Sequence, residues 1–231
     1  MTQTQHSRST PRIVLIHALA DSKTPALAAF QRGWPDASLH NLMDDALAAD
    51  LAAQGGITPA IEDRFMILGR YAQGTCGADG QTRGILFTCS AFGPAIDRVR
   101  ADLDIPVLKP NEAAFEKAVT LGRRIGLLLT FENALEPLRG ELLEIAARAG
   151  TDIVVSHAVA HGALAALQAG NEQEHDRLVA EAASAMVEVD ALVLCQFSLA
   201  RAAPVIPAIT GRTVLTTPDS AVAKLRRLLA G

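Results

Sequence analysis

Two cysteines, Cys89 and Cys195, stand where an apolar run of the sequence gives way to a loop. Their contexts match: the first lies in ILFTCSA (residues 85–91) and the second in LVLCQFS (residues 192–198). Such apolar runs predict buried strands, and open parallel sheets bind ligands beyond the carboxyl ends of their strands. A helix that begins close behind each cysteine would favour its thiolate. Both thiols are therefore expected at a sheet edge where chemistry is done.

Two thiols that face opposite sides of a substrate can invert a carbon centre, because one removes a proton while the other supplies one. The ordinary thiol pKa of about 8.5 needs little adjustment for either role near neutral pH. Backbone N–H groups at the helix starts would hold a carboxylate and stabilise an enolate-like intermediate. A single cysteine at a strand end is more often a packing residue. The hypothesis therefore depends on two matching contexts in one chain.

The rest of the chain alternates short apolar runs with longer amphipathic segments, which predicts an α/β fold. Strands are expected at residues 12–17, 38–42, 84–88, 105–108, 124–130, 152–156, 191–194 and 214–216. Helices are expected at residues 59–72, from 94 to about 103, at 111–121, from 133 to about 149, at 171–189 and from 217 onward. The strongest strands are apolar throughout, as parallel strands covered on both faces are.

This order of elements favours two similar lobes, each a parallel sheet flanked by helices. We expect a disordered tail at residues 1–11, a first lobe made of residues 12–108 and 210–231, and a second lobe made of residues 109–209. The C-terminal helix would then return to the first lobe.

Composition argues against several classes of protein. The 231 residues are 49% hydrophobic and 20% charged, with a net charge of −4, which is typical of a globular domain. Basic residues are scattered, so no nucleic-acid surface is expected. No apolar stretch approaches the roughly 18 residues of a membrane helix, and the polar N-terminus does not resemble a signal peptide. We expect a cytoplasmic protein with reduced thiols.

Three other features have both a chemical and an ordinary interpretation. Cys76 lies in a glycine-rich segment, residues 74–82. The ordinary interpretation of this segment is a surface loop, and the functional interpretation is a lid over the site. His157 and His161 have the i, i+4 spacing of a metal pair, but no third ligand is evident, so no metal site is expected. His17 ends the first expected strand, where packing and a contact with the site are equally plausible.

Four phenylalanines flank the proposed site in the sequence: Phe87, Phe92, Phe131 and Phe197. Core packing is the ordinary interpretation for each of them. Phe92 and Phe197 are the best candidates for an apolar substrate pocket.

At this point the sequence resembles the Asp/Glu/hydantoin racemase superfamily. Its members have two lobes related by a pseudo-twofold axis, and each lobe supplies one cysteine after a strand. The Thr88-Cys89-Ser90 and Leu194-Cys195-Gln196 segments occupy the places of the family's Cys-Asn-Thr and Gly-Cys-Thr motifs. The resemblance covers nearly the whole chain and implies an enzyme without metal or organic cofactor, with weaker support for a homodimer.

The resemblance also implies roles for individual residues. Cys89 and Cys195 would be the catalytic acid/base pair. The substrate-binding residues would be Asp21, Ser22, Thr88, Ser90, Ala91, Gln196 and Phe197. Ser22, Thr88 and Ser90 would hold a carboxylate.

The chain departs from the family motifs at Ala91 and at Gln196-Phe197, where the amino-acid racemases grip their substrate. These departures weaken the expectation of an aspartate or glutamate substrate. We expect a racemase or epimerase of a small carboxylate, amino-acid derivative or hydantoin. A maleate isomerase, an arylmalonate-decarboxylase-like enzyme and a non-catalytic carboxylate-binding protein are the alternatives.

Overall fold

The first sheet is built from strands β1 (Arg12–His17), β2 (Ser38–Met43), β4 (Gly80–Phe87) and β5 (Val107–Leu108). They are parallel and lie in the order β2-β1-β4-β5. The computed structural model describes residues 10–206 and 210–230, so the tail expected at residues 1–11 falls almost entirely outside the described residues.

Helices cover both faces of this sheet. Helices α2 (Leu47–Gln54), α3 (Pro59–Gly74) and α4 (Gly93–Asp102) lie on one face, where Phe65, Phe87 and Val99 share a core. Helix α1 (Lys23–Gly33) lies on the other face. The short 3-10 turns η1 (Ala20–Ser22) and η2 (Ser90–Phe92) follow β1 and β4.

The second sheet repeats the strand order of the first. Its strands are β6 (Arg124–Leu129), β7 (Val154–Val159), β8 (Ala191–Leu194) and β9 (Thr213–Thr216), all parallel and in the order β7-β6-β8-β9. Helices α5 (Glu112–Leu121) and α6 (Leu135–Arg148) pack on one face. Helices α7 (Ala163–Gln168) and α8 (Glu172–Ser184) pack on the other. The 3-10 turns η3 (Glu132–Ala134) and η4 (Phe197–Ala202) follow β6 and β8.

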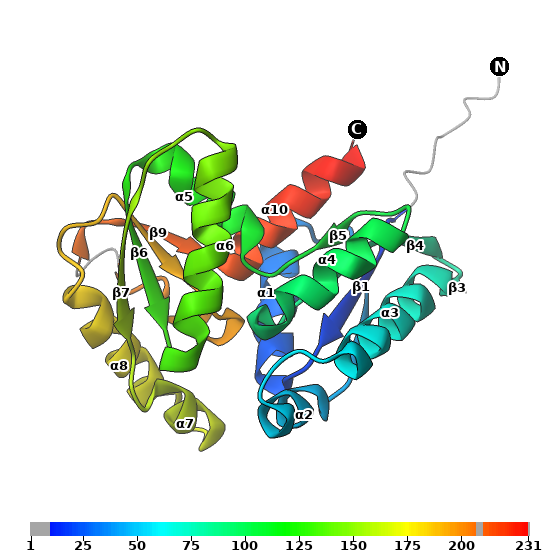
Figure 1. The fold of residues 1–231 in the computed structure, drawn as a ribbon, viewed down its shortest axis with the longest axis horizontal. Coiled ribbons are helices and arrows are strands. Elements are labelled where there is room, and N and C mark those ends of the chain that lie inside the picture. The colour runs from blue at the N-terminus through cyan, green and yellow to red at the C-terminus, as the bar shows by residue number, and fades with distance from the viewer. Residues whose placement is uncertain (1–9, 207–209, 231) are drawn as a thin grey trace.

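The two lobes lie side by side, and helix α10 (Thr217–Ala230) runs across their junction (Figure 1). Ala221, Val222 and Leu225 of α10 pack in the same core as Ile13 and Phe30. The C-terminal helix thus packs on the core of the first lobe. Strand β9, which precedes it, pairs with β8 of the second sheet.

The expected strand–helix alternation and the two-lobe α/β architecture are confirmed. Apolar runs match the strands closely because both faces of each central strand are covered, which demands continuous apolar sequence. The helix expected at residues 171–189 is shorter, since α8 ends at Ser184. Its start is defined by Asn171, whose side chain accepts a hydrogen bond from the Glu174 N–H.

The interpretation of residues 74–82 as a loop or lid is wrong. Strand β3 (Cys76–Gly77) pairs antiparallel with the start of β4 and forms a tight hairpin. Asp79 in this hairpin accepts hydrogen bonds from Arg12 and Ser38 and contacts His40. These partners lie at or near the amino ends of their strands, so the hairpin is anchored at the sheet edge opposite the cysteines. None of the helices in the described ranges is long and apolar enough to cross a membrane.

Candidate active site

The two cysteines meet at one cavity between the lobes. Cys89 follows β4 of the first sheet, and Cys195 follows β8 of the second. The cavity has a volume of about 60 Å³, and its walls are the segments that follow β1, β4, β6 and β8. The lining residues are Leu19, Asp21, Ser22, Thr88, Cys89, Ser90, Ala91, Pro110, Thr130, Phe131, Leu164, Cys195, Gln196, Phe197 and Ser198. Each lobe thus contributes one thiol.

The two thiols differ in burial: Cys195 is buried, and Cys89 is partly buried. Cys195 is 1% exposed, and its Sγ donates to the Val193 carbonyl at 3.4 Å. Burial raises its pKa well above the ordinary value, and the nearby negative charge of Glu141 adds to the rise. Burial also raises the pKa of Cys89, against a smaller opposing hydrogen bond from the Ala91 backbone.

Both cysteines are therefore neutral thiols in this arrangement. The expectation that helix starts would favour thiolates is wrong for it. A short 3-10 turn follows Cys89 directly and another begins two residues after Cys195, and desolvation is the largest cause of both raised pKa values.

A buried histidine contacts the two hydroxyl residues of the first lobe that line the cavity, Ser22 and Thr88, which we call the first-lobe wall. His17 is fully buried at the end of β1. Its Nδ1 lies 2.9 Å from Thr88 Oγ1 and 3.2 Å from Ser22 Oγ, and its Nε2 lies 2.9 Å from Asn41 Oδ1. The two hydroxyl oxygens are 2.8 Å apart. Burial lowers the His17 pKa, so the ring is neutral near pH 7.

On the second lobe, Thr130 and Gln196 line the cavity and form the second-lobe wall, where a backbone hydrogen bond orients the Gln196 carboxamide. Gln196 Oε1 accepts a hydrogen bond from the Thr130 backbone N–H at 3.0 Å. Because a backbone N–H can only donate, the oxygen of this side chain is identified and its Nε2 is directed elsewhere. Gln196 Nε2 and Thr130 Oγ1 are both buried without a hydrogen-bond partner among the described residues. Unpaired buried polar atoms are costly, so a ligand in the cavity would satisfy them.

One exposed hydrogen bond joins the two lobes at Asp21, which lines the cavity. Gln168 Nε2 of α7 donates to Asp21 Oδ2 of η1 at 3.1 Å. Typical ligand sites have volumes of roughly 300–1,000 Å³, so this cavity is smaller than a substrate needs.

The structure brings together at one cavity the two catalytic candidates and all seven substrate-binding candidates of the sequence, but not Phe92. The lining includes Asp21, Ser22, Thr88, Cys89, Ser90, Ala91, Cys195, Gln196 and Phe197. Phe92 does not belong to it: the side chain is 0% exposed and packs on Phe65, with ring centroids 4.8 Å apart. Sequence reasoning missed Thr130, which directly follows strand β6 as Thr88 directly follows β4.

His157 and His161, the two histidines with metal-pair spacing, lie in different elements and do not form a metal site with other described residues. His157 is within strand β7, and its Nε2 lies 3.4 Å from Glu132 Oε1. His161 is exposed in the turn before α7. Across residues 10–206 and 210–230, no cluster of three or more His, Cys, Asp or Glu residues has the arrangement of a metal site.

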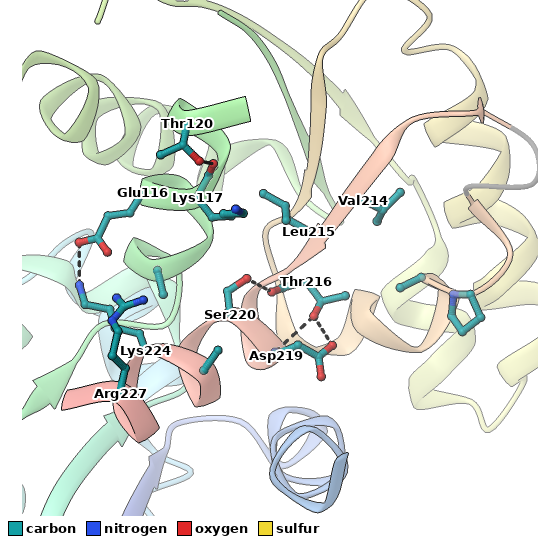
Figure 2. A pocket seen from close by; sticks show the side chains of 14 residues that line it. Glu116, Lys117, Thr120, Val214, Leu215, Thr216, Asp219, Ser220, Lys224 and Arg227 are labelled. Atoms are coloured by element: carbon teal, nitrogen blue, oxygen red, sulfur yellow. Dashed lines mark hydrogen bonds and ion pairs between the residues drawn. The ribbon is translucent and has the colours of Figure 1, made fainter. Parts of the chain in front are cut away.

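A larger cavity of about 790 Å³ lies elsewhere, between α5, β9 and α10 (Figure 2). Several of its polar groups are already paired. Lys224 forms an ion pair with Glu116, and Thr216 donates to Asp219. Neither cysteine of the pair lines this cavity, so size alone does not identify the reactive site.

Solved structures of similar fold include several racemases. An allantoin racemase from Klebsiella pneumoniae has a TM-score of 0.70 and 20% identity, covering 95% of this chain and 88% of that chain. A glutamate racemase from Bacillus anthracis has a TM-score of 0.68 and 12% identity, covering 96% and 82%. An unliganded arylmalonate decarboxylase has a TM-score of 0.58 and 16% identity, covering 96% and 94%. These likenesses show the two-lobe fold.

No curated protein matches the sequence closely enough to serve as a relative. The family model for Asp/Glu/Hydantoin racemase, in contrast, matches residues 1–225. With a thiol from each lobe at one cavity and a family match over nearly its whole length, the chain belongs to the Asp/Glu/hydantoin racemase family.

Proposed function

We propose that this protein is a racemase or epimerase that acts without metal or organic cofactor on a small carboxylate, amino-acid derivative or hydantoin. The observation that carries the proposal is the placement of Cys89 and Cys195, which approach one cavity from different lobes. A flat carbanion held between them would be reached from both faces. Family membership supports an isomerase, and the thiol pair supplies the mechanism.

In the proposed reaction, one cysteine acts as a thiolate and removes the proton from the reacting carbon. The electron pair of the broken C–H bond moves toward the neighbouring carbonyl group, which becomes enolate-like. The thiol of the other cysteine then donates its proton to the opposite face and is left as a thiolate. The reverse reaction uses the same groups in exchanged roles, so no external proton is consumed.

The second-lobe wall is suited to the developing charge. Gln196 Nε2 is a buried donor without a partner in the described part of the chain, beside Cys195 in the sequence. A donor that is already fixed by the Thr130 N–H needs no reorganisation when charge develops on a substrate oxygen. We assign Gln196 to the substrate oxygen on this basis.

The high thiol pKa values impose a condition on the reaction. One cysteine must lose its proton before turnover, and burial opposes this in the closed cavity. Lobe opening exposes the thiols to water and lowers that cost. Deprotonation in the open form followed by closure on substrate would leave one thiolate and one thiol in place.

Proton exchange in D₂O, followed by NMR, tests the proposal. The panel contains aspartate, glutamate, hydantoins, maleate and arylmalonates, and the proteins are wild type, Cys89→Ser, Cys195→Ser and the control Cys76→Ser. We expect loss of an α-proton signal with wild type and the control, and at least a 100-fold slower loss with either site variant. The control is matched because Cys76 is an exposed cysteine in the hairpin at the opposite sheet edge.

Other outcomes would redirect the assignment. Consumption of maleate would indicate a cis–trans isomerase, and loss of carboxylate from an arylmalonate with Cys89→Ser still active would indicate a decarboxylase. Ligand binding without turnover, unchanged in both variants, would indicate a binding protein. A homodimer and a cytoplasmic location stay predictions from the sequence, and sedimentation would test the first.

A further inference from the structure

We propose that Phe197 anchors the second lobe in the core of the first and so positions Cys195 across the cavity from Cys89. On this inference Phe197 is a positioning residue, whereas the resemblance to the family implied a substrate contact. The inference rests on the proposed function, because a two-thiol reaction needs a fixed relation between thiols that come from different lobes.

Phe197 belongs to the second lobe in sequence but to the first lobe in packing. Its side chain is 2% exposed and packs in the apolar cluster that contains Ile13 and Phe30. Among the residues that the structure describes, every other buried member of this cluster lies in the first lobe or in α10. Cys195, two residues earlier in the chain, packs in the cluster of the second lobe with Val193. One short segment thus buries its side chains in the cores of both lobes.

The first lobe receives Phe197 beside helices α1 and α10, both of which contact η4. The cluster includes Ala26 and Ala29 of α1 and Ala221 of α10, each no more than 1% exposed. Alanines leave room that a ring from another segment can fill. A smaller side chain at position 197 would therefore leave a cavity at the junction of the lobes.

The rest of η4 is fixed to the second lobe. Leu199 and Ala202 pack in that lobe's second apolar cluster, and Arg201 Nε donates to Asp176 Oδ1 of α8 at 2.8 Å. A 3-10 turn of six residues is unusually long, so it depends on such contacts. Because η4 is held by its own lobe, the insertion of Phe197 into the first-lobe core ties the two lobes together close to the second thiol.

The polar link between the lobes at the cavity is weak by comparison. The hydrogen bond from Gln168 to Asp21 is exposed, and an exposed hydrogen bond contributes little because water competes for both groups. Burial of a phenyl ring removes far more apolar surface from water. Proton transfer to opposite faces of one carbon requires a fixed separation of the thiols, and a misplacement of about 1 Å can slow a reaction roughly 100-fold. The packing of Phe197 sets this separation.

Spin-label distances test the anchor without any substrate. One nitroxide is attached to Cys76, which is exposed on the first lobe. The other is attached at Glu144→Cys, an exposed position of α6 on the second lobe. Double electron–electron resonance then measures the distribution of distances between the lobes, and mass spectrometry verifies that Cys89 and Cys195 carry no label.

Three variants are compared with wild type in this labelled protein. Phe197→Val loses much of the ring, and Phe197→Met keeps most of its volume. The matched control is Phe65→Val, because Phe65 is also 2% exposed but packs entirely within the first lobe. We expect Phe197→Val alone to broaden the distribution or add a second, longer distance. If Phe197→Val does not fold, as circular dichroism would show, Phe197→Leu and Phe65→Leu make the same comparison.

Steady-state kinetics with the substrate that proton exchange identifies test the role of the anchor. Positioning predicts that kcat falls about 10- to 100-fold in Phe197→Val while KM stays within about 3-fold of wild type. A substrate contact predicts the reverse, a higher KM with little change in kcat. Phe197→Met and Phe65→Val should keep both constants within about 3-fold of wild type.

The outcomes separate this inference from the proposed function. An unchanged distance distribution in Phe197→Val, or equal broadening in Phe65→Val, would overturn the inference, as would a raised KM with unchanged kcat. Broadening confined to the Phe197 variant, together with a loss in kcat alone, would establish it. Absence of α-proton exchange by wild type would overturn the proposed function, and the spin-label distances would still decide whether Phe197 anchors the lobes.

Discussion

Lys109 is the residue whose removal tests the electrostatics of the lobe junction most directly. It follows β5, where the chain leaves the first sheet. Its Nζ lies 3.2 Å from Asp97 Oδ2 of α4 and 3.4 Å from Glu141 Oε1 of α6, so it joins helices of the two lobes. The side chains of Lys109 and Glu141 are each 11% exposed. Asp97 is half exposed and contributes less.

The expected magnitude follows from this geometry. At 3.4 Å, two unit charges attract by about 5 kcal/mol if the effective dielectric constant is about 20, since 332/(20 × 3.4) ≈ 4.9. Desolvation cancels part of this attraction in the intact pair. Removing one partner leaves the other charge buried and typically costs about 3–5 kcal/mol. We expect Lys109→Met to lower the free energy of unfolding by roughly 3 kcal/mol at pH 8.

The loss should shrink in acid. Burial raises the pKa of Glu141, so the folded state holds this proton more tightly than the unfolded state, whose pKa is near 4.5. Without Lys109 the pKa of Glu141 rises further. As the pH falls, Glu141 in the variant takes up a proton at a higher pH than in wild type, and the uncompensated charge disappears.

Urea unfolding at pH 5 and pH 8 measures these losses of unfolding free energy. The proteins compared are wild type, Lys109→Met, Glu141→Gln and the double variant. The double variant should recover to within about 1 kcal/mol of wild type, because no buried charge is left unpaired. Lys117→Met is a matched control: Lys117 is exposed and has no ion pair in the described ranges, so we expect a change within about 0.5 kcal/mol. Equal losses for Lys109→Met and Lys117→Met, or simple addition of the two single losses in the double variant, would refute the reasoning.

Three further predictions concern the site groups. Glu141→Gln removes a negative charge that raises the pKa of Cys195, so alkylation of Cys195 by iodoacetamide should begin at lower pH than in wild type; an unchanged pH profile would contradict this. Burial lowers the pKa of His17, so the unfolded chain binds that proton more tightly, and stability should fall as the pH drops below about 6.5. His17→Gln should flatten this part of the stability curve, and a curve of unchanged slope would count against it. Cys76 is exposed and should react with a thiol reagent at least 10-fold faster than Cys89 or Cys195, as time-resolved mass spectrometry would show.

The architecture could be read from the sequence because parallel sheets leave a strong local signal. Runs such as residues 85–87 and 192–194 are apolar at every position, since helices cover both faces of the central strands. The same signal identified the two cysteines. Cys195 directly follows its apolar run, and Cys89 follows its run after one intervening residue, Thr88. Asp21, Ser22 and Phe197 were placed at the site by resemblance to the family.

Features that depend on distant partners could not be read in this way. The hairpin at Cys76–Gly77 looked like a loop, because its anchor is the long-range contact of Asp79 with Arg12 and Ser38. Phe92 looked like a pocket residue, but whether an aromatic side chain turns toward a cavity or toward Phe65 depends on the packing of α3.

Local patterns of residue type were enough to predict the fold class, the two-lobe order and the pair of thiols. The burial of those thiols and the partners of His17 could be known only from the folded chain, because both depend on distant residues. The pKa of a thiol depends on how many atoms from other elements exclude water around it. The partner of His17 Nε2 is Asn41, which lies on the neighbouring strand and 24 residues away in the chain.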